Sequence, residues 1–202
     1  MPGFVSFREG FRWLLDELDE PTLTIVLSGK DTGAFVDVRF LQTSASTLEW
    51  AFAGFRHAED RNRVRFEHLL DSRTTNPASI IDAGTMVELS KPGRSLERGS
   101  MINPETGRYS PYEEVWQEEA VASDVAIVRR RDGQIWKARV GDWQLEVGRD
   151  ERGCWAWQAR RPDGCWEIVR ITKNASAPYF LPNDRVAVEE WAADGWEIIE
   201  CS

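Results

Sequence analysis

Apolar and polar residues alternate along most of the chain with a period of two residues. This period is that of a strand with two unlike faces, and Gly-containing turns such as GKDTG (29–33) are typical of hairpins. The strand-like segments are residues 22–28, 34–41, 47–56, 63–70, 79–89, 96–102, 124–130, 135–140, 143–147, 185–191 and 196–200, together with the two arms of segment 153–170. The sequence therefore predicts a mostly β fold of short antiparallel strands.

Segment 153–170 (GCWAWQARRPDGCWEIVR) places three of the ten tryptophans in one predicted hairpin. Trp155 and Trp157 alternate with smaller or polar residues, a Pro-Asp-Gly turn follows, and Trp166 begins the second arm. Indoles on both arms can meet as cross-strand pairs. Two interpretations stay open: a packed barrel wall, or an aromatic cavity for an apolar ligand.

A helical spacing occurs only in residues 11–20 (FRWLLDELDE). Phe11, Leu14, Leu15 and Leu18 fall on one side of a helix there. We therefore expect little helix, confined to this segment.

The two halves of the chain look alike, because each contains a Trp-bearing hairpin at a similar relative position. Between them, residues 102–120 (INPETGRYSPYEEVWQEEA) are rich in Pro, Gly, Tyr and Glu, a composition that favours an ordered connector. We expect two similar antiparallel β-barrel lobes, an N-terminal lobe of residues 1–118 that includes the connector and a C-terminal lobe of residues 119–202.

The connector also carries a resemblance. Thr106-Gly107, followed by Tyr112-Glu113-Glu114-Val115-Trp116, is similar to the linker of a fungal family of two-lobed, lipocalin-like (calycin-like) proteins typified by a yeast protein that interacts with casein kinase. The resemblance implies two calycin-like barrels packed together. The resemblance also implies a relationship to proteins that resemble hetero-Diels–Alderases of tropolone–sesquiterpene biosynthesis.

Charge and composition exclude several partners and compartments. A formal net charge of −9 repels phosphate backbones and anionic membrane surfaces, so we expect neither nucleic acid nor membrane as a partner. The opening MPGFVSFREG is too polar for a signal peptide, and a cytoplasmic location is the expectation. Three cysteines have no metal-like spacing, and whether Cys154 and Cys165 pair stays open.

The familiar catalytic signatures are missing from the sequence. It has no Gly-rich phosphate loop, no G-x-S-x-G elbow and no dinucleotide fingerprint. Only His57 and His68 are present, which is too few for a multi-histidine metal site. We therefore expect no metal and no cofactor.

His68 and Arg39 are the candidate catalytic residues. In RVRFEHLL, His68 shares a face with Val64, Phe66 and Leu70, so it is either a core histidine with a hydrogen-bond partner or an acid or base that faces a cavity. Arg39 follows Asp37 by two residues, so the pair is either an exposed salt bridge worth under about 1 kcal/mol or a cation inside a barrel that can reach an enolate or phenolate oxygen.

Aromatic residues supply the candidate substrate-binding set. These are Trp50, Phe52 and Phe66 from one hairpin, and Tyr109, Tyr112 and Trp116 from the connector. The connector aromatics either cover a barrel mouth or pack between the lobes. The connector glutamates Glu113, Glu114, Glu118 and Glu119 are most simply a solvated acidic surface.

Three functions remain open on this evidence. The first, which the resemblance favours, is a fungal biosynthetic enzyme, a cofactor-independent pericyclase that binds a polyketide- or terpenoid-like apolar intermediate and promotes a hetero-Diels–Alder type cycloaddition by positioning it. The second is a non-catalytic, lipocalin-like carrier of a small apolar molecule. The third is an acidic protein that binds a kinase. Association into a homodimer stays open for all three.

Overall fold

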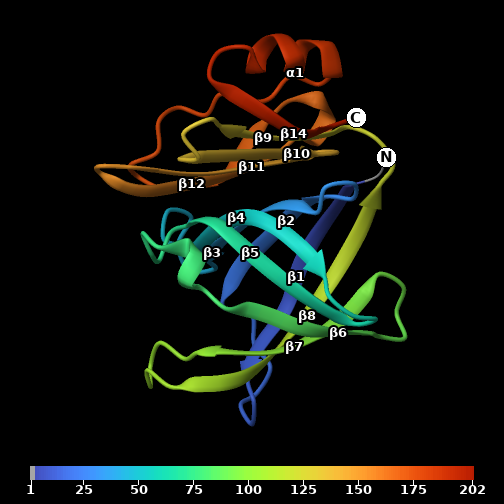
Figure 1. The fold of residues 1–202 in the computed structure, drawn as a ribbon, viewed down its shortest axis with the longest axis vertical. Helices are drawn as coiled ribbons and strands as arrows, with labels where there is room; N and C mark the ends of the chain where they lie inside the picture. The colour runs from blue at the N-terminus through green and yellow to red at the C-terminus, as the bar shows by residue number, and fades with distance from the viewer. Residues whose placement is uncertain (1–2) are drawn as a thin grey trace.

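A computed structural model describes residues 3–202 as an eight-stranded barrel with a second sheet lying across it (Figure 1). The barrel strands are β1 (Gly3–Trp13), β2 (Thr22–Gly29), β3 (Ala34–Leu41), β4 (Leu48–Ala58), β5 (Arg63–Asp71), β6 (Asp82–Glu88), β7 (Arg94–Ile102) and β8 (Tyr109–Val121). Each strand pairs antiparallel with the next, and β8 pairs with β1. The result is a closed up-and-down barrel.

The second lobe is a six-stranded antiparallel sheet in the order β13-β12-β11-β10-β9-β14. Its elements are β9 (Val125–Arg130), β10 (Ile135–Val140), β11 (Trp143–Asp150), β12 (Gly153–Arg160), β13 (Glu167–Ile171), α1 (Arg185–Ala192) and β14 (Trp196–Cys201), and the one-turn 3-10 helices are η1 (Pro77–Ser79) and η2 (Pro162–Gly164). The mostly β, two-lobed fold class is confirmed. The barrel is closed, whereas this sheet is open because its edge strands β13 and β14 do not pair.

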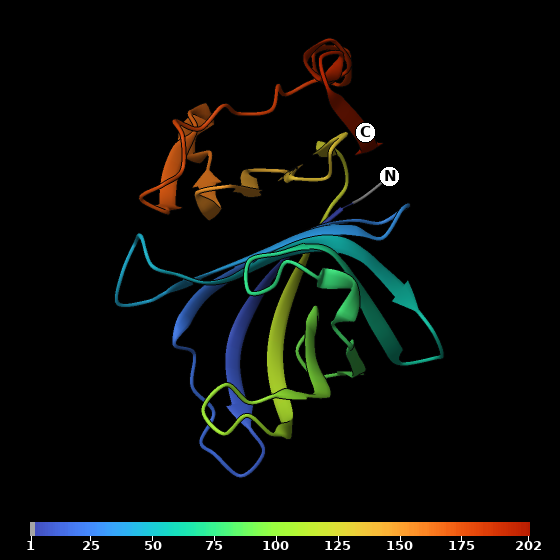
Figure 2. The ribbon, with the colours of Figure 1, turned by 60° about the vertical axis from the view of Figure 1, so that its left-hand side comes forward.

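The main hydrophobic core lies between the barrel and the sheet. Figure 2 shows the sheet lying across one side of the barrel, and β10, β11 and β12 contact β2, β3 and β4. Alternate residues of β3, including Val36 and Val38, face this core with no exposed surface, beside Trp136 and Leu145 of the sheet. The strand is therefore buried on both faces, because its other residues point into the barrel.

The expected helix over residues 11–20 is wrong. β1 continues to Trp13, which pairs with Tyr112 of β8, and turns follow. Leu15 has a φ of 87° and is 96% exposed, so the leucines that suggested a helix face solvent in a loop. Pairing of residues 11–13 with β8 outweighs local helical spacing here.

The expected strand over residues 185–191 is also wrong, because these residues form α1. Asp184 caps the helix by accepting a hydrogen bond from the Ala187 N–H. Val188 and Ala192, four residues apart, face the sheet and are buried. A short apolar run therefore had helical rather than strand periodicity. Within residues 3–202, no helix is both long and apolar enough to cross a membrane.

Most of the segment expected to connect the lobes, residues 109–120, lies in β8, the last strand of the barrel. Its pairing with β1 ends at Val121, and β9 begins at Val125. The predicted division between residues 118 and 119 falls within β8, and the domain boundaries stay a prediction.

The shared core predicts that the two lobes unfold together. Trp136 has no exposed surface and meets Phe55 of the barrel edge-on, with ring centroids 5.8 Å apart. We expect Trp136→Ala to lower the free energy of unfolding by about 3–5 kcal/mol in denaturant titrations. Leu15→Ala, at an exposed position, should change it by less than about 0.5 kcal/mol. Two separate unfolding transitions in the wild-type chain would contradict a shared core.

Candidate functional site

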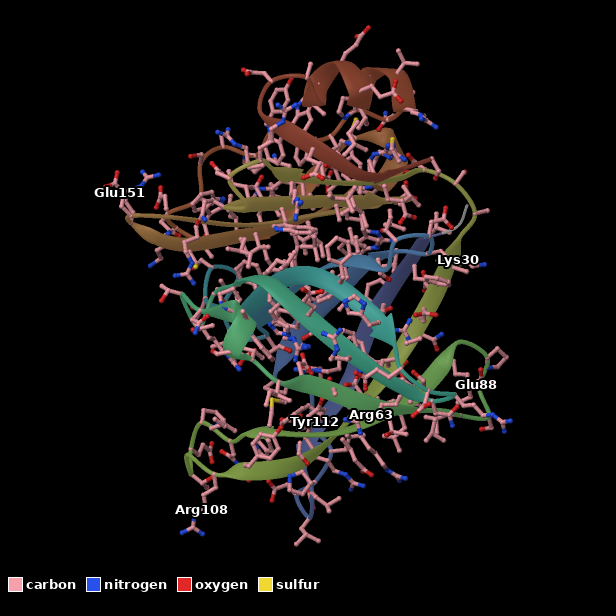
Figure 3. The ribbon with its side chains drawn as sticks, in the orientation of Figure 1. Lys30, Arg63, Glu88, Arg108, Tyr112 and Glu151 are labelled. Atoms are coloured by element: carbon pink, nitrogen blue, oxygen red, sulfur yellow. The ribbon has the colours of Figure 1, made fainter. Side chains whose placement is uncertain are left out.

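The barrel encloses a cavity of about 120 Å³. Its aromatic lining residues are Phe35, Trp50, Phe52, Phe66, Tyr112 and Trp116, and its charged lining residues are Asp37, Arg39, Arg56, Asp82, Glu97, Glu114 and Glu118. Figure 3 shows Tyr112 in the half of the barrel far from the second sheet. The cavity therefore combines aromatic walls with a concentration of carboxyl groups.

Arg39 lies at the centre of a buried ion-pair network. Its Nη2 lies 2.8 Å from Asp37 Oδ2, and its Nη1 lies 3.1 Å from Glu114 Oε1. Burial disfavours charge on the guanidinium, but Asp37 and Glu114 hold the pKa of Arg39 well above its ordinary value. The alternative of an exposed surface pair is wrong, since Arg39 is only 5% exposed and faces the barrel interior.

Arg8 of β1 extends this network across the barrel. Its Nη1 donates to Glu114 Oε1 at 2.5 Å, its Nε donates to Glu20 at 2.7 Å, and its Nη2 donates to the Thr22 hydroxyl at 2.8 Å. Burial works against ionisation of Glu114, but Arg39 and Arg8 outweigh it and lower the pKa of that carboxyl. The network thus joins β1, β3 and β8 through charged side chains.

Aromatic rings enclose the Arg39 guanidinium. Its central carbon lies 4.8 Å from the Trp50 ring centroid and 5.4 Å from that of Phe52. Rings attract a cation through their electron-rich faces, so these contacts add to the ion pairs. Arg39 therefore serves as a structural part of the cavity wall as well as a hydrogen-bond donor.

Glu97 is a buried acid without a counter-ion. Its Oε1 accepts a hydrogen bond from the Tyr112 hydroxyl at 3.0 Å, and it forms no ion pair with the residues that the structure describes. Burial, with the negative charges of Glu114 and Asp82, raises the pKa of Glu97 to about 8. It is therefore mostly a neutral carboxylic acid at pH 7.

Two glycines make room for this pair. A Cβ at Gly84 would lie 2.6 Å from Glu97 Oε1, and a Cβ at Gly99 would lie 2.4 Å from the Tyr112 hydroxyl. Gly84 and Gly99 face each other across β6 and β7. The close approach of acid and phenol thus depends on two positions without side chains.

His68 does not line the cavity, although its neighbours do. Its side chain has no exposed surface, and its Nδ1 and Nε2 lie 2.8 Å from Asp71 and 2.9 Å from Asp82. Its ring stacks on Phe52 with centroids 4.2 Å apart. Since carboxylates only accept hydrogen bonds, both ring nitrogens must donate, which requires the imidazolium form. Burial disfavours the charged imidazole, but the hydrogen bonds that the ring donates to Asp71 and Asp82 outweigh this effect and raise the pKa of His68.

The structure brings most of the predicted substrate-binding residues together. Trp50, Phe52, Phe66, Tyr112 and Trp116 line the cavity with Arg39. Tyr109 does not, since it is 61% exposed at the start of β8. Whether any of these residues acts on a ligand stays a prediction.

The tryptophans of segment 153–170 lie away from the cavity. Trp157 is fully buried in the second sheet, and its ring packs with those of Trp191 and Trp196 around the Lys137 ammonium at 5.5–5.7 Å. Trp157 therefore packs within the second lobe. Cys154 and Cys165 are free thiols, and Cys165 is exposed.

Sequence reasoning missed the acidic part of the cavity. Glu114 and Glu118 lie on its wall rather than on a solvated surface, and Glu97 and Asp82 were not considered. The period-two spacing of Tyr112, Glu114, Trp116 and Glu118 was a usable signal, because alternate residues of a strand share a face. Among residues 3–202, no three His, Cys, Asp or Glu side chains are grouped so as to hold a metal ion.

A closed up-and-down barrel with an internal cavity defines this chain as a lipocalin-like barrel protein. The family model described as Protein HRI1 matches residues 4–200, and the chain belongs to that family. This confirms the family resemblance found in the connector, whereas the link to hetero-Diels–Alderases stays a prediction. No curated protein and no solved structure matches the chain.

The ion-pair network predicts a large loss of stability on removing its central cation. Arg39→Met leaves Asp37 and Glu114 buried without that partner, and we expect the free energy of unfolding to fall by about 3–5 kcal/mol at pH 7. Arg63→Met, which breaks an exposed pair with Glu59, should cost less than about 1 kcal/mol. Similar small effects of both substitutions in denaturant titrations would show that the network does not hold the barrel together.

The His68 contacts predict a pH-dependent contribution to stability. Since the folded pKa of His68 is raised above about 6.5, the value in an unfolded chain, this contribution is complete below about pH 6.5 and is lost as pH rises through the folded pKa. His68→Gln should remove this decline above about pH 6.5. NMR titration of the imidazole gives a direct measurement, and a midpoint at or below about 6.5 would contradict the assigned charge state.

Proposed function

We propose that the barrel binds a small molecule with a mainly apolar body in the cavity. The observation that carries this proposal is an internal space bordered by six aromatic side chains, in a barrel of the strand number that can hold one small ligand. Family membership and barrel fold are both compatible with lipocalin-like binding.

The size of the cavity limits the ligand. Its volume of about 120 Å³ is close to that of an engineered cavity of about 150 Å³ that holds benzene. Sites for drug-sized ligands span about 300–1,000 Å³. A compact ligand of one ring and a short chain fits this space, whereas a polyketide- or terpenoid-like ligand would need the wall to move.

Filling the cavity should weaken ligand binding. We expect the neutral probe 2-phenylethanol to bind saturably, as measured by calorimetry and by Trp fluorescence, because it buries its ring against the aromatic walls. Val26→Phe places a ring on the cavity wall and should weaken binding at least about tenfold. Val87→Phe, the matched change at a position exposed on β6, should leave the affinity within about threefold. Equal affinities for the two variants would place the probe elsewhere.

Cycloaddition of the hetero-Diels–Alder type is a second candidate, and one observation favours it. The Trp116 indole N–H is buried on the cavity wall and has no hydrogen-bond partner among the described residues. A pericyclic reaction needs its reactants held in a productive pose, and a fixed donor that polarises a carbonyl lowers the barrier further. If a heterodiene and an alkene bind but no product forms, the result would favour a carrier without catalytic activity. Formation of the cyclic product in the cavity would favour the enzyme.

A kinase-binding role is the third expectation. It concerns the acidic surface rather than the cavity, and it is compatible with ligand binding by the barrel.

A further inference from the structure

The carboxyl groups that line the cavity differ in whether they have a charged partner. Five carboxyl groups border it, those of Asp37, Asp82, Glu97, Glu114 and Glu118, against two guanidinium groups, those of Arg39 and Arg56. Asp37 and Glu114 pair with Arg39, which is thereby committed, while Arg56 is exposed to solvent. Glu114 also pairs with Arg8, and Asp82 pairs with His68. Glu97 and Glu118 form no ion pair among residues 3–202, and of the two only Glu97 is buried.

Glu97 is the buried carboxyl group of the cavity wall that lacks a counter-ion. It is 4% exposed, its Oε1 accepts from Tyr112, and its Oε2 has no hydrogen-bond or ion-pair partner among residues 3–202. Buried carboxyl groups are normally paired or coordinate a cation. The cavity thus holds a carboxyl group with one oxygen available and no positive side chain assigned to it.

We propose that the cavity selects a small organic cation: an amine on an aromatic or compact aliphatic body, whose ammonium group supplies the counter-ion that Glu97 lacks. This inference rests on the proposed binding function and names its ligand class. The aromatic walls support it, because indole and phenyl faces attract cations, as Trp50 and Phe52 already do with Arg39. The same walls bury the apolar part of the amine.

The groups that face Glu97 couple amine binding to the release of a proton. Glu114 and Tyr112 approach it from β8, Asp82 from β6 and Arg39 from β3, and burial together with the two acids raises its pKa to about 8 in the empty cavity. An ammonium group favours the ionised carboxylate, so amine binding below pH 8 releases a proton. Amine affinity should therefore rise with pH by up to about tenfold per unit, and level off near pH 8 while the amine stays charged.

Three probes of similar size separate the possible ligand classes: 2-phenylethylamine, 2-phenylethanol and 3-phenylpropanoate. Calorimetry between about pH 6 and pH 9 should show the amine binding at least about tenfold more tightly than the alcohol at pH 8.5, and the carboxylate most weakly. Glu97→Gln should reduce the amine-to-alcohol ratio to less than about threefold and remove its pH dependence, while the alcohol keeps its affinity. Glu88→Gln, at an exposed position labelled in Figure 3, is the matched control and should behave as wild type.

The outcomes distinguish this inference from the function beneath it. If the alcohol or the carboxylate binds as tightly as the amine, or if Glu97→Gln keeps the amine preference, the cation assignment is wrong while ligand binding stands. If none of the three probes binds, both are wrong.

Discussion

Compensation of buried charge is the constraint on which the barrel depends. The outer face of β3 is covered by the second sheet, so its polar residues have only the barrel interior to occupy. Arg39 and Asp37 therefore need partners inside, and Glu114 with Arg8 supplies them from β8 and β1. Buried ion pairs add little net stability, but breaking one is costly. We infer that this network fixes the register in which distant strands close the barrel.

The cavity is a consequence of the same arrangement. Ion pairs and their aromatic neighbours occupy part of the interior, while Gly84 and Gly99 leave space around Glu97 and Tyr112. What remains is a small space with aromatic walls and one buried acid that has no counter-ion. The same residues therefore stabilise the barrel and line the cavity. Arg39 is better understood as a structural part of the cavity wall than as a free catalytic group.

The sequence predicted elements well wherever period-two alternation was clear, as in residues 22–28 and 34–41. It failed where another pattern competed: leucines in residues 11–20 mimicked a helix, and the short α1 mimicked a strand. The aromatic half of the site could be predicted, because large apolar residues at alternate positions of a strand indicate a buried face. The acidic half could not be predicted so easily, since glutamates in β8 resemble a solvated surface until the barrel closes around them.

Indole N–H signals in two-dimensional NMR spectra test the location of ligand binding most directly. Trp50 and Trp116 line the cavity, whereas Trp136 and Trp157 are buried outside it, and single Trp→Phe variants assign each signal. On titration with 2-phenylethylamine, we expect the Trp50 and Trp116 signals to shift together and saturate, while those of Trp136 and Trp157 stay in place. Shifts confined to tryptophans outside the barrel, or no saturable shift of Trp50 and Trp116, would contradict ligand binding in this cavity.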